Sequence, residues 1–249
     1  MKNMTKLTLF LVLFPFSTIY AKNNEFDLFI EVGGLWQHRN DVQVPVATGT
    51  RIGFDQFNQG PFLHYRLEGY LRISPKTALR WVYAPAEFEV SGRADEVIVF
   101  NGESYSDTED VTVNYKFNSY RFSYIHSFWG FGDDQLNLGF TGKIRDAQVT
   151  FSQPGVSSSY GNNMLGFAPL VYFEYQKPLG ENWKFNLTMD AAAAPQGRAI
   201  DAAFKFRRSI RKGSSLGLGI RSLEGGAEND KVYSFVWFNY AVLELKIGF

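Results

Sequence analysis

The sequence predicts an all-β fold, a transmembrane up-and-down antiparallel β-barrel of ten strands that is preceded by a cleavable signal peptide. Three observations predict it. The composition favours strands, because 24 Phe, 13 Tyr and 5 Trp occur together with 23 Gly in 249 residues, while segments with helical periodicity are few. Ten segments alternate between apolar and polar residues. The N-terminus carries a short apolar run of the kind that directs export.

Residues 1–21 have the three parts of a secretory signal peptide. A positive start with Lys2 and Lys6 precedes an apolar centre and an exit of small residues, so cleavage is expected after Ala21. The apolar run is too short to cross a bilayer as a helix, which needs about 20 residues. Residues 22–249 are then expected to form one barrel domain.

Charge and cysteine content narrow the classes of protein that remain. Removal of the signal peptide leaves 23 basic and 25 acidic residues, so the mature chain has no overall positive field that would attract nucleic acid. The sequence contains no cysteine, which excludes disulfides and a lipoprotein anchor. An exported chain without helical spans belongs in the periplasm, the medium or the outer membrane.

The ten alternating segments are each long enough for the roughly 9–11 tilted residues that cross a bilayer. In the clearest segment, apolar residues at odd positions from Trp183 to Met189 alternate with polar residues at even positions from Lys184 to Asp190. The segments are expected at 25–39, 58–73, 77–90, 110–128, 134–151, 163–177, 182–194, 198–211, 214–224 and 231–249.

The fourth segment, 110–128, breaks the alternation, because its apolar residues are odd-numbered up to Phe117 and even-numbered from Tyr120. A β-bulge near Asn118 or Ser119 would restore the register by adding one residue. Alternatively, the first half of the segment extends above the membrane, where the facing rule relaxes. The sequence leaves both possibilities open.

The connections between segments alternate in length, as they do in membrane barrels. The periplasmic links are short and rich in turn residues, whereas three outer links, 40–57, 91–109 and 152–162, are long and polar. The exception is a tight outer turn at 194–197, which would leave the seventh and eighth strands low at the rim. A soluble sandwich or lipocalin-like barrel shares the alternation, but strand length, the signal peptide and aromatic residues near the strand ends favour the membrane.

Charged residues on the other face of the strands must then point into a narrow lumen, where they pair or stay hydrated. A structural ion-pair network is favoured over a polar channel or a ligand-binding cleft. Polar segments at 116–121, 142–147, 194–203 and 221–230 could also gather in the outer half of the barrel. The candidate lumen network comprises Glu31, Arg66, Glu68, Arg80, Arg121, Lys143, Arg145, Asp190, Asp201, Lys205, Arg221 and Glu244.

No catalytic residue, metal site or cofactor is predicted. His126 and Ser127 are adjacent in a strand and so point to opposite faces. The ten strands resemble those of omptin proteases, but the only Asp-Asp pair, Asp133-Asp134, is assigned to a periplasmic turn and not to the outer rim. The acidic run 107–110 is interpreted as a solvated loop tip and not as a cation site.

The last strand alternates and ends in the aromatic residue Phe249. It resembles the closing strand of bacterial outer-membrane barrels, which implies that Phe249 is the signal read by the barrel-assembly machinery. Phrases such as Lys-Ile-Arg-Asp-Ala at 143–147 and Ala-Pro-Gln-Gly-Arg-Ala-Ile-Asp at 194–201 resemble those of a group of proteobacterial outer-membrane proteins. That resemblance implies the outer membrane of a Gram-negative bacterium and no particular activity.

For function, the sequence favours a non-enzymatic outer-membrane protein with a charged, largely occluded lumen: structural, surface-interacting or a narrow passive channel. Outer-membrane lipid and lipopolysaccharide are its expected partners, nucleic acid is not, and a small-molecule ligand stays unknown. Two alternatives are open. One is an enzyme that modifies lipid A or phospholipid, and the other is an adhesin that acts through the three long outer links.

Overall fold

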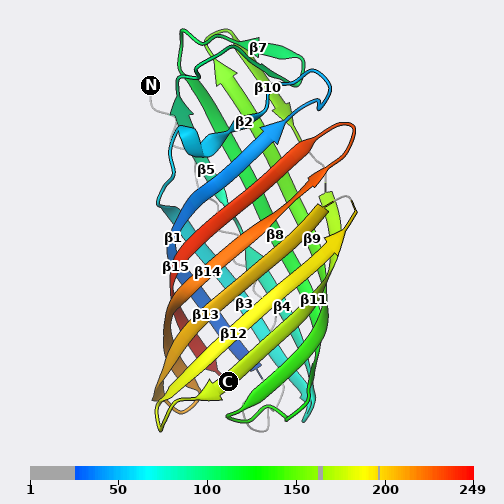
Figure 1. Cartoon of the computed structure of the whole chain (residues 1–249). Coiled ribbons are helices and arrows are strands. Elements are labelled where there is room, and N and C mark those ends of the chain that lie inside the picture. Colours follow the sequence, from blue (N-terminus) through cyan, green and yellow to red (C-terminus); the bar gives the residue numbers. More distant parts are fainter. Residues whose placement is uncertain (1–25, 162–164, 196) are drawn as a thin grey trace, which may run out of the picture.

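Ten long strands close into an antiparallel barrel in the computed structural model, which describes residues 26–161, 165–195 and 197–249 (Figure 1). Each strand pairs with the next, and β15 pairs with β1 to close the wall, so the predicted fold class is confirmed. The predicted signal peptide lies outside the described residues. The barrel strands are β1 (Phe26–Gln43), β3 (Phe62–Ser74), β4 (Thr77–Ala84), β8 (Val111–Ser127), β9 (Gln135–Gln153), β11 (Leu165–Pro178), β12 (Trp183–Ala194), β13 (Gly197–Arg211), β14 (Ser214–Glu228) and β15 (Tyr233–Gly248).

The outer surface of the barrel is apolar, as the alternation predicts. Leu63, Phe140 and Phe167 are 79%, 75% and 72% exposed. A soluble protein rarely leaves such large apolar side chains uncovered over a continuous belt, whereas lipid solvates them. Other members of the belt are Tyr65, Trp81, Phe122, Tyr124, Val171, Phe204, Phe206, Leu216, Leu218, Ile220 and Leu243.

Among the described residues, no helix is long and apolar enough to span a membrane.

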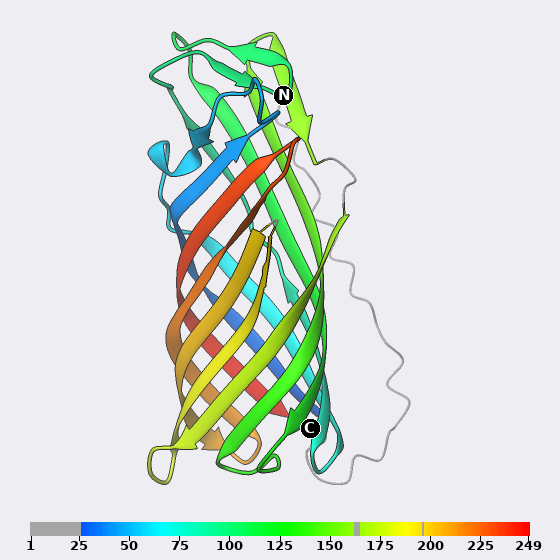
Figure 2. The same cartoon turned by 45° about the vertical axis from the view of Figure 1, so that its right-hand side comes forward.

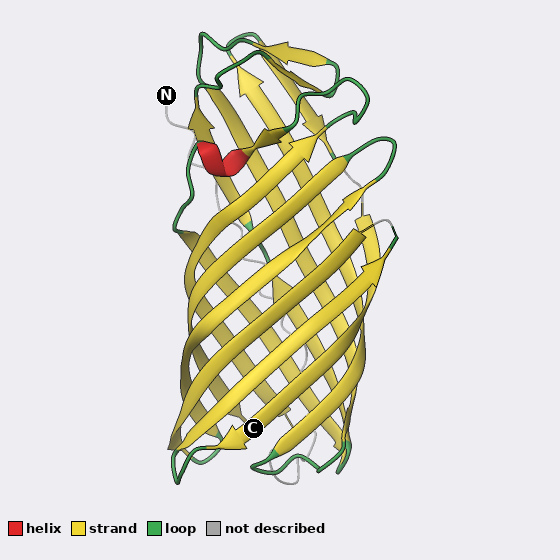
Figure 3. Cartoon of the chain, in the orientation of Figure 1, coloured by secondary structure: helices red, strands yellow, loops and turns green. Residues whose placement is uncertain are grey.

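The two ends of the barrel differ. Short turns connect the strands at the end where Phe249 lies, which is therefore the periplasmic end (Figures 1 and 3). The links at the outer end are longer than the periplasmic turns, as predicted, and they carry further short elements that the sequence did not predict. These elements are β2 (Ile52–Gly53), the 3-10 turn η1 (Phe54–Gln56), β5 (Glu87–Gly92), β6 (Ile98–Phe100), β7 (Glu103–Tyr105) and β10 (Val156–Tyr160).

The outer elements enclose an apolar core that fills the outer end of the barrel. Phe54 is fully buried, with its ring 5.7 Å from that of Phe151 and 6.1 Å from that of Tyr115. Phe100 from β6 stacks on Phe151 at 4.3 Å. The barrel interior is thus apolar near the outer end and, as described below, charged further down.

The change from an apolar to a charged interior explains the broken alternation of the fourth predicted segment, 110–128. The pairing of β8 with β9 runs from Thr112↔Ser152 to Ser127↔Asn137 without a shift, so the predicted bulge near Asn118 or Ser119 is absent from this pair. Val111, Val113 and Tyr115 are buried in the outer core, whereas Tyr120 and Phe122 face outward. The strand keeps its register, and its first half extends into an apolar interior instead of a polar one.

The third segment is interrupted. β4 ends at Ala84 and β5 begins at Glu87, and both pair with β8 in a common register on either side of Pro85. The side chain of Asn118 accepts a hydrogen bond from the backbone N–H of Ala86 at 3.2 Å, which satisfies one donor that the break leaves free.

The wall is low at β12 and β13, as the tight outer turn predicts (Figure 2). The last pair of the hairpin is Ala194↔Gly197, and Gln196 of the predicted turn lies outside the described residues. β11 pairs with β12 only as far as Val171↔Ala191, yet β11 continues along β9 to Leu165↔Asp146. The wall therefore forks between β11 and β12 in its outer half.

Candidate functional site

Asp201 of β13 lies at the centre of a buried ion-pair network inside the barrel. Its carboxylate contacts three guanidinium groups, those of Arg66 at 3.3 Å, Arg121 at 2.6 Å and Arg221 at 2.6 Å. These arginines come from β3, β8 and β14. All four side chains are buried, so the ion pairs join different parts of the wall across the interior.

Asp190 of β12 is the second acidic centre. Arg121 donates to it at 2.7 Å and Arg80 at 3.2 Å, while the hydroxyl of Thr141 donates at 2.9 Å. Arg80 also donates to Glu68 at 3.1 Å. Because Arg121 contacts both acidic centres, the network is continuous from β3 and β4 to β12 and β13.

A third branch starts at Glu31 of β1. Arg221 donates two hydrogen bonds to its carboxylate, at 2.9 Å and 3.0 Å, and a ring nitrogen of His64 lies 3.0 Å away. Lys205 contacts both Glu31 and Glu244, and Arg207 donates to Glu244 at 2.6 Å. Each of these buried carboxylates thus has more than one charged or hydrogen-bonding partner, the arrangement that offsets desolvation.

The structure brings together ten of the twelve predicted network residues and leaves two outside. Lys143 and Arg145 of β9 point into the barrel as predicted, but among the described residues neither has a carboxylate within ion-pair distance. The cause lies in the register. On the neighbouring strands, Lys143 lies opposite Arg121 and Ala168, so no acid faces it. Its ammonium lies 5.0 Å from the centre of the Phe117 ring.

Several buried charged residues lie outside the twelve-residue candidate network. Glu174 accepts hydrogen bonds from Asn137 at 2.8 Å and Asn186 at 3.0 Å, and Asp27 pairs with Arg72 at 2.7 Å. Arg207 and His64, described above, also lie outside that network. Asp27, His64, Glu174 and Arg207 all lie at inward positions of their strands, where the alternation places them.

Two cavities lie on either side of the network. The outer one measures about 350 Å³, and its lining includes Arg121 and Asp201 of the network. The periplasmic one measures about 440 Å³ and is bounded by Glu68 and Arg207. No described residue lines both cavities, and the ion pairs separate them.

The positions considered for catalysis do not form a catalytic site. His126 is exposed and Ser127 is buried, on opposite faces of β8, as predicted. Asp133 lies in the turn before β9, where Lys184 donates to it at 2.7 Å and lowers the pKa of its carboxyl. Within the described ranges, no three His, Cys, Asp or Glu residues gather in a way that could hold a metal ion.

Comparison with known proteins supports the fold. The outer membrane protease OmpT from Escherichia coli matches with a TM-score of 0.55 and 9% identity, over 90% of this chain and 96% of that chain. Ail, the attachment invasion locus protein of Yersinia pestis, matches with a TM-score of 0.41 and 11% identity, over 88% of this chain and 99% of that chain. No protein-family model and no curated protein sequence matches this chain.

The closed barrel, its apolar belt and its charged interior define the class: an integral β-barrel protein of the outer membrane of a Gram-negative bacterium. At 9% identity the likeness to OmpT extends to the fold alone. The resemblance to one particular proteobacterial group stays a prediction.

Proposed function

We propose that this protein is a closed, non-enzymatic outer-membrane barrel, which serves the envelope as a structural or surface-interacting protein and does not form an open pore. One observation carries the proposal: Asp201 holds Arg66, Arg121 and Arg221, from three other strands, in the middle of the lumen. A permeating ion would have to separate ion pairs whose partners are buried, at a cost of several kcal/mol.

A second barrier lies above the network. The outer apolar core includes Leu35, Phe54 and Phe238, each at most 1% exposed. An apolar plug in a narrow tube excludes water and therefore ions. The network and the outer core block the lumen independently of one another.

The outer end supports a surface role. The hairpin of β6 and β7 pairs Ile98 with Tyr105, and the Tyr105 hydroxyl contacts Ser158 of β10 at 2.8 Å. The predicted loops are therefore held in one arrangement, and a preorganised surface binds a partner at a lower entropic cost than free loops would. Contact with outer-membrane lipid and lipopolysaccharide along the belt belongs to the same proposal.

Planar-bilayer recording tests the closed lumen. The refolded protein is expected to give small or no steady conductance, under conditions in which a sixteen-stranded porin gives its usual current. Heat-modifiability on SDS gels confirms that the sample is folded. A stable nanosiemens-scale pore would overturn the proposal.

Mass spectrometry of lipid A and phospholipids tests the non-enzymatic part. Strains with and without the gene are expected to have the same lipid profile. An acyl chain gained or lost only when the gene is present would establish an enzyme instead.

A further inference from the structure

The fork between β11 and β12 opens the barrel wall toward the membrane. Beyond Val171↔Ala191, residues 165–170 of β11 pair with β9 on one side only, and residues 192–194 of β12 pair only with β13. Pro169 lies on the free stretch of β11, and proline in sheets is confined to such unpaired edges. A residue that suits an unpaired strand edge therefore lies where β11 and β12 separate.

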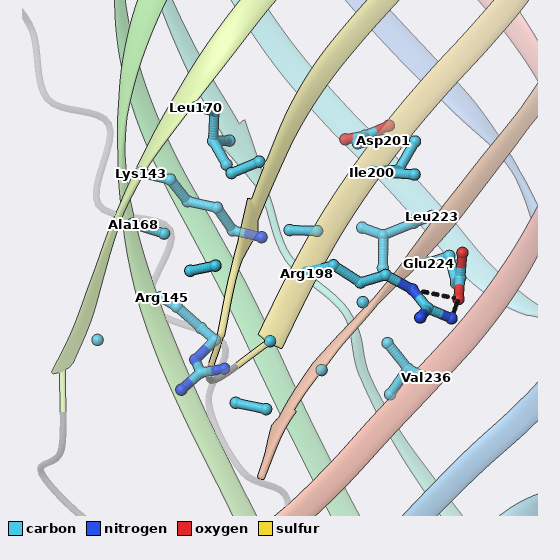
Figure 4. A pocket seen from close by; sticks show the side chains of 18 of the residues that line it. Lys143, Arg145, Ala168, Leu170, Arg198, Ile200, Asp201, Leu223, Glu224 and Val236 are labelled. Carbon is cyan, nitrogen blue, oxygen red and sulfur yellow. Dashed lines mark hydrogen bonds and ion pairs between the residues drawn. The ribbon is translucent and has the colours of Figure 1, made fainter.

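The outer cavity lies directly behind this fork. Both edges of the fork line it, with Ala168 and Leu170 from β11 and Ala192 and Ala193 from β12 (Figure 4). The short side chains of the three alanines leave the space open. Leu223 on the far side adds to a lining that is mostly apolar.

The mouth of the cavity lies at the height of the lipid belt. Phe167 is 72% exposed and Ile200 is 37% exposed, and both belong to the cavity lining as well as to the outward apolar surface. An apolar chain could therefore pass between lipid and cavity without crossing a polar surface.

The ammonium group of Lys143 is a buried cation inside the outer cavity. Lys143 is only 6% exposed, and its ammonium points toward the side chains that surround the cavity (Figure 4). Among the described residues no carboxylate lies within ion-pair distance of this ammonium. By contrast, an acidic partner pairs with each of six other inward cations, Arg66, Arg80, Arg121, Lys205, Arg207 and Arg221. A buried charge without a partner is costly, so the site favours an anion that supplies one.

Apart from Arg145, the other charged groups that line the cavity already have ion-pair partners. Arg198 already pairs with Glu224, and Asp201 is held by three arginines. Arg145 lies next to Lys143 on the same face of β9 and, within the described part of the chain, makes no ion pair either. Arg145 is thus a second cation of the cavity lining that has no ion pair among the described residues.

We propose that the outer cavity binds an anionic amphiphile that enters sideways from the membrane. Its carboxylate or phosphate pairs with Lys143 and Arg145, and its acyl chain lies along Leu170, Ala192 and Leu223 and leaves through the fork. This inference goes beyond the closed-barrel function, because a sealed lumen neither requires nor forbids a site in the wall.

Equilibrium binding in a nonionic detergent tests the proposal, with laurate, dodecyl phosphate and uncharged dodecanol as probes. The wild-type protein is expected to bind at least one of the two anions at least tenfold more tightly than dodecanol. Tighter binding of dodecyl phosphate assigns a membrane lipid as the source, and tighter binding of laurate assigns a free fatty acid. Equal binding of all three probes would overturn the proposal.

Variants locate the site. In Lys143→Met the preference for the anion is expected to fall at least tenfold, while Lys177→Met, an exposed lysine at the periplasmic end of β11, retains it. An unchanged preference in Lys143→Met contradicts the site. If Lys143→Met fails to fold, Ala192→Phe supplies the test, since filling the cavity should abolish binding of all three probes and leave Lys143 in place.

Discussion

Asp190 of β12 and Asp201 of β13 lie directly opposite one another in the strand register, and the guanidinium of Arg121 bridges their two carboxylates at 2.7 Å and 2.6 Å. Like charges directly opposite on neighbouring strands repel one another, and burial strengthens the repulsion. The bridging arginine turns this repulsion into a three-residue link between β8, β12 and β13.

Replacing Arg121 by Met should therefore destabilise the barrel strongly. Breaking a buried ion pair by removing one partner costs about 3–5 kcal/mol, because it leaves an uncompensated charge. We expect a loss of this size in the free energy of unfolding, measured by urea titration of the barrel in lipid vesicles. Arg198→Met is the matched control, since its partly exposed pair with Glu224 should contribute at most about 1 kcal/mol. Equal losses in both variants would contradict a buried network.

A second substitution tests whether Arg121 stabilises the barrel by bridging the two acids. Asp190→Asn removes one of the two facing charges, so in the Arg121→Met background it should restore part of the lost stability. The double-mutant cycle isolates this coupling. Additive losses would show that Arg121 acts by packing and not by bridging the two acids.

Disrupting the outer apolar core should leave the barrel below it folded. Phe54→Ala removes a fully buried ring that packs against Tyr115 and Phe151, and such truncations cost about 3–5 kcal/mol locally. We expect protease added outside the cell to cleave the 44–61 link, while heat-modifiability of the barrel is retained. Val97→Ala, which alters an exposed residue of the outer end, should leave the link resistant.

Trp81 covers Gly69 on the lipid face, where the two residues lie opposite one another on β4 and β3. A Cβ atom at position 69 would lie 2.1 Å from the indole, so Gly69→Ala must turn Trp81 away. We expect a loss of about 1 kcal/mol in unfolding free energy, the cost of an unfavourable rotamer, together with a shift in Trp81 fluorescence. In a Trp81→Leu background the same substitution should cost less.

Phe249 should matter for assembly more than for stability. Its ring is 59% exposed and lies 5.9 Å from the ring of Phe26. We expect Phe249→Ala to reduce the amount of folded barrel in the outer membrane of cells, while the refolded protein loses only about 0.5 kcal/mol, as for other surface changes. Phe249→Tyr keeps the aromatic ring and should restore the cellular level. A large loss of stability in the refolded Phe249→Ala protein would contradict an assembly signal.

Several features of the fold could be predicted from single segments of the chain. The alternation from Trp183 to Asp190 determines which side chains meet lipid and which face the lumen, because the side-chain period of a strand is two. The same rule placed Asp201 and Arg221 inside. The tight turn after Ala194 predicted the low rim.

Other features depend on contacts between distant segments. The outer apolar core escaped prediction because its members, such as Phe54 and Phe100, are scattered through links that are otherwise polar. The break at Pro85 was missed because β5 resumes the register of β4 on the far side of it.

The sequence by itself determined the strands, their faces and the charge of the interior, since these properties depend on residues only one or two positions apart. Only the tertiary structure decided which charges pair. Arg66 reaches Asp201 across the closed barrel, whereas Lys143 meets Arg121 and Ala168 on its neighbouring strands. The relative register of ten strands and the closure of the wall bring such partners together, and no local pattern in the chain encodes either of them.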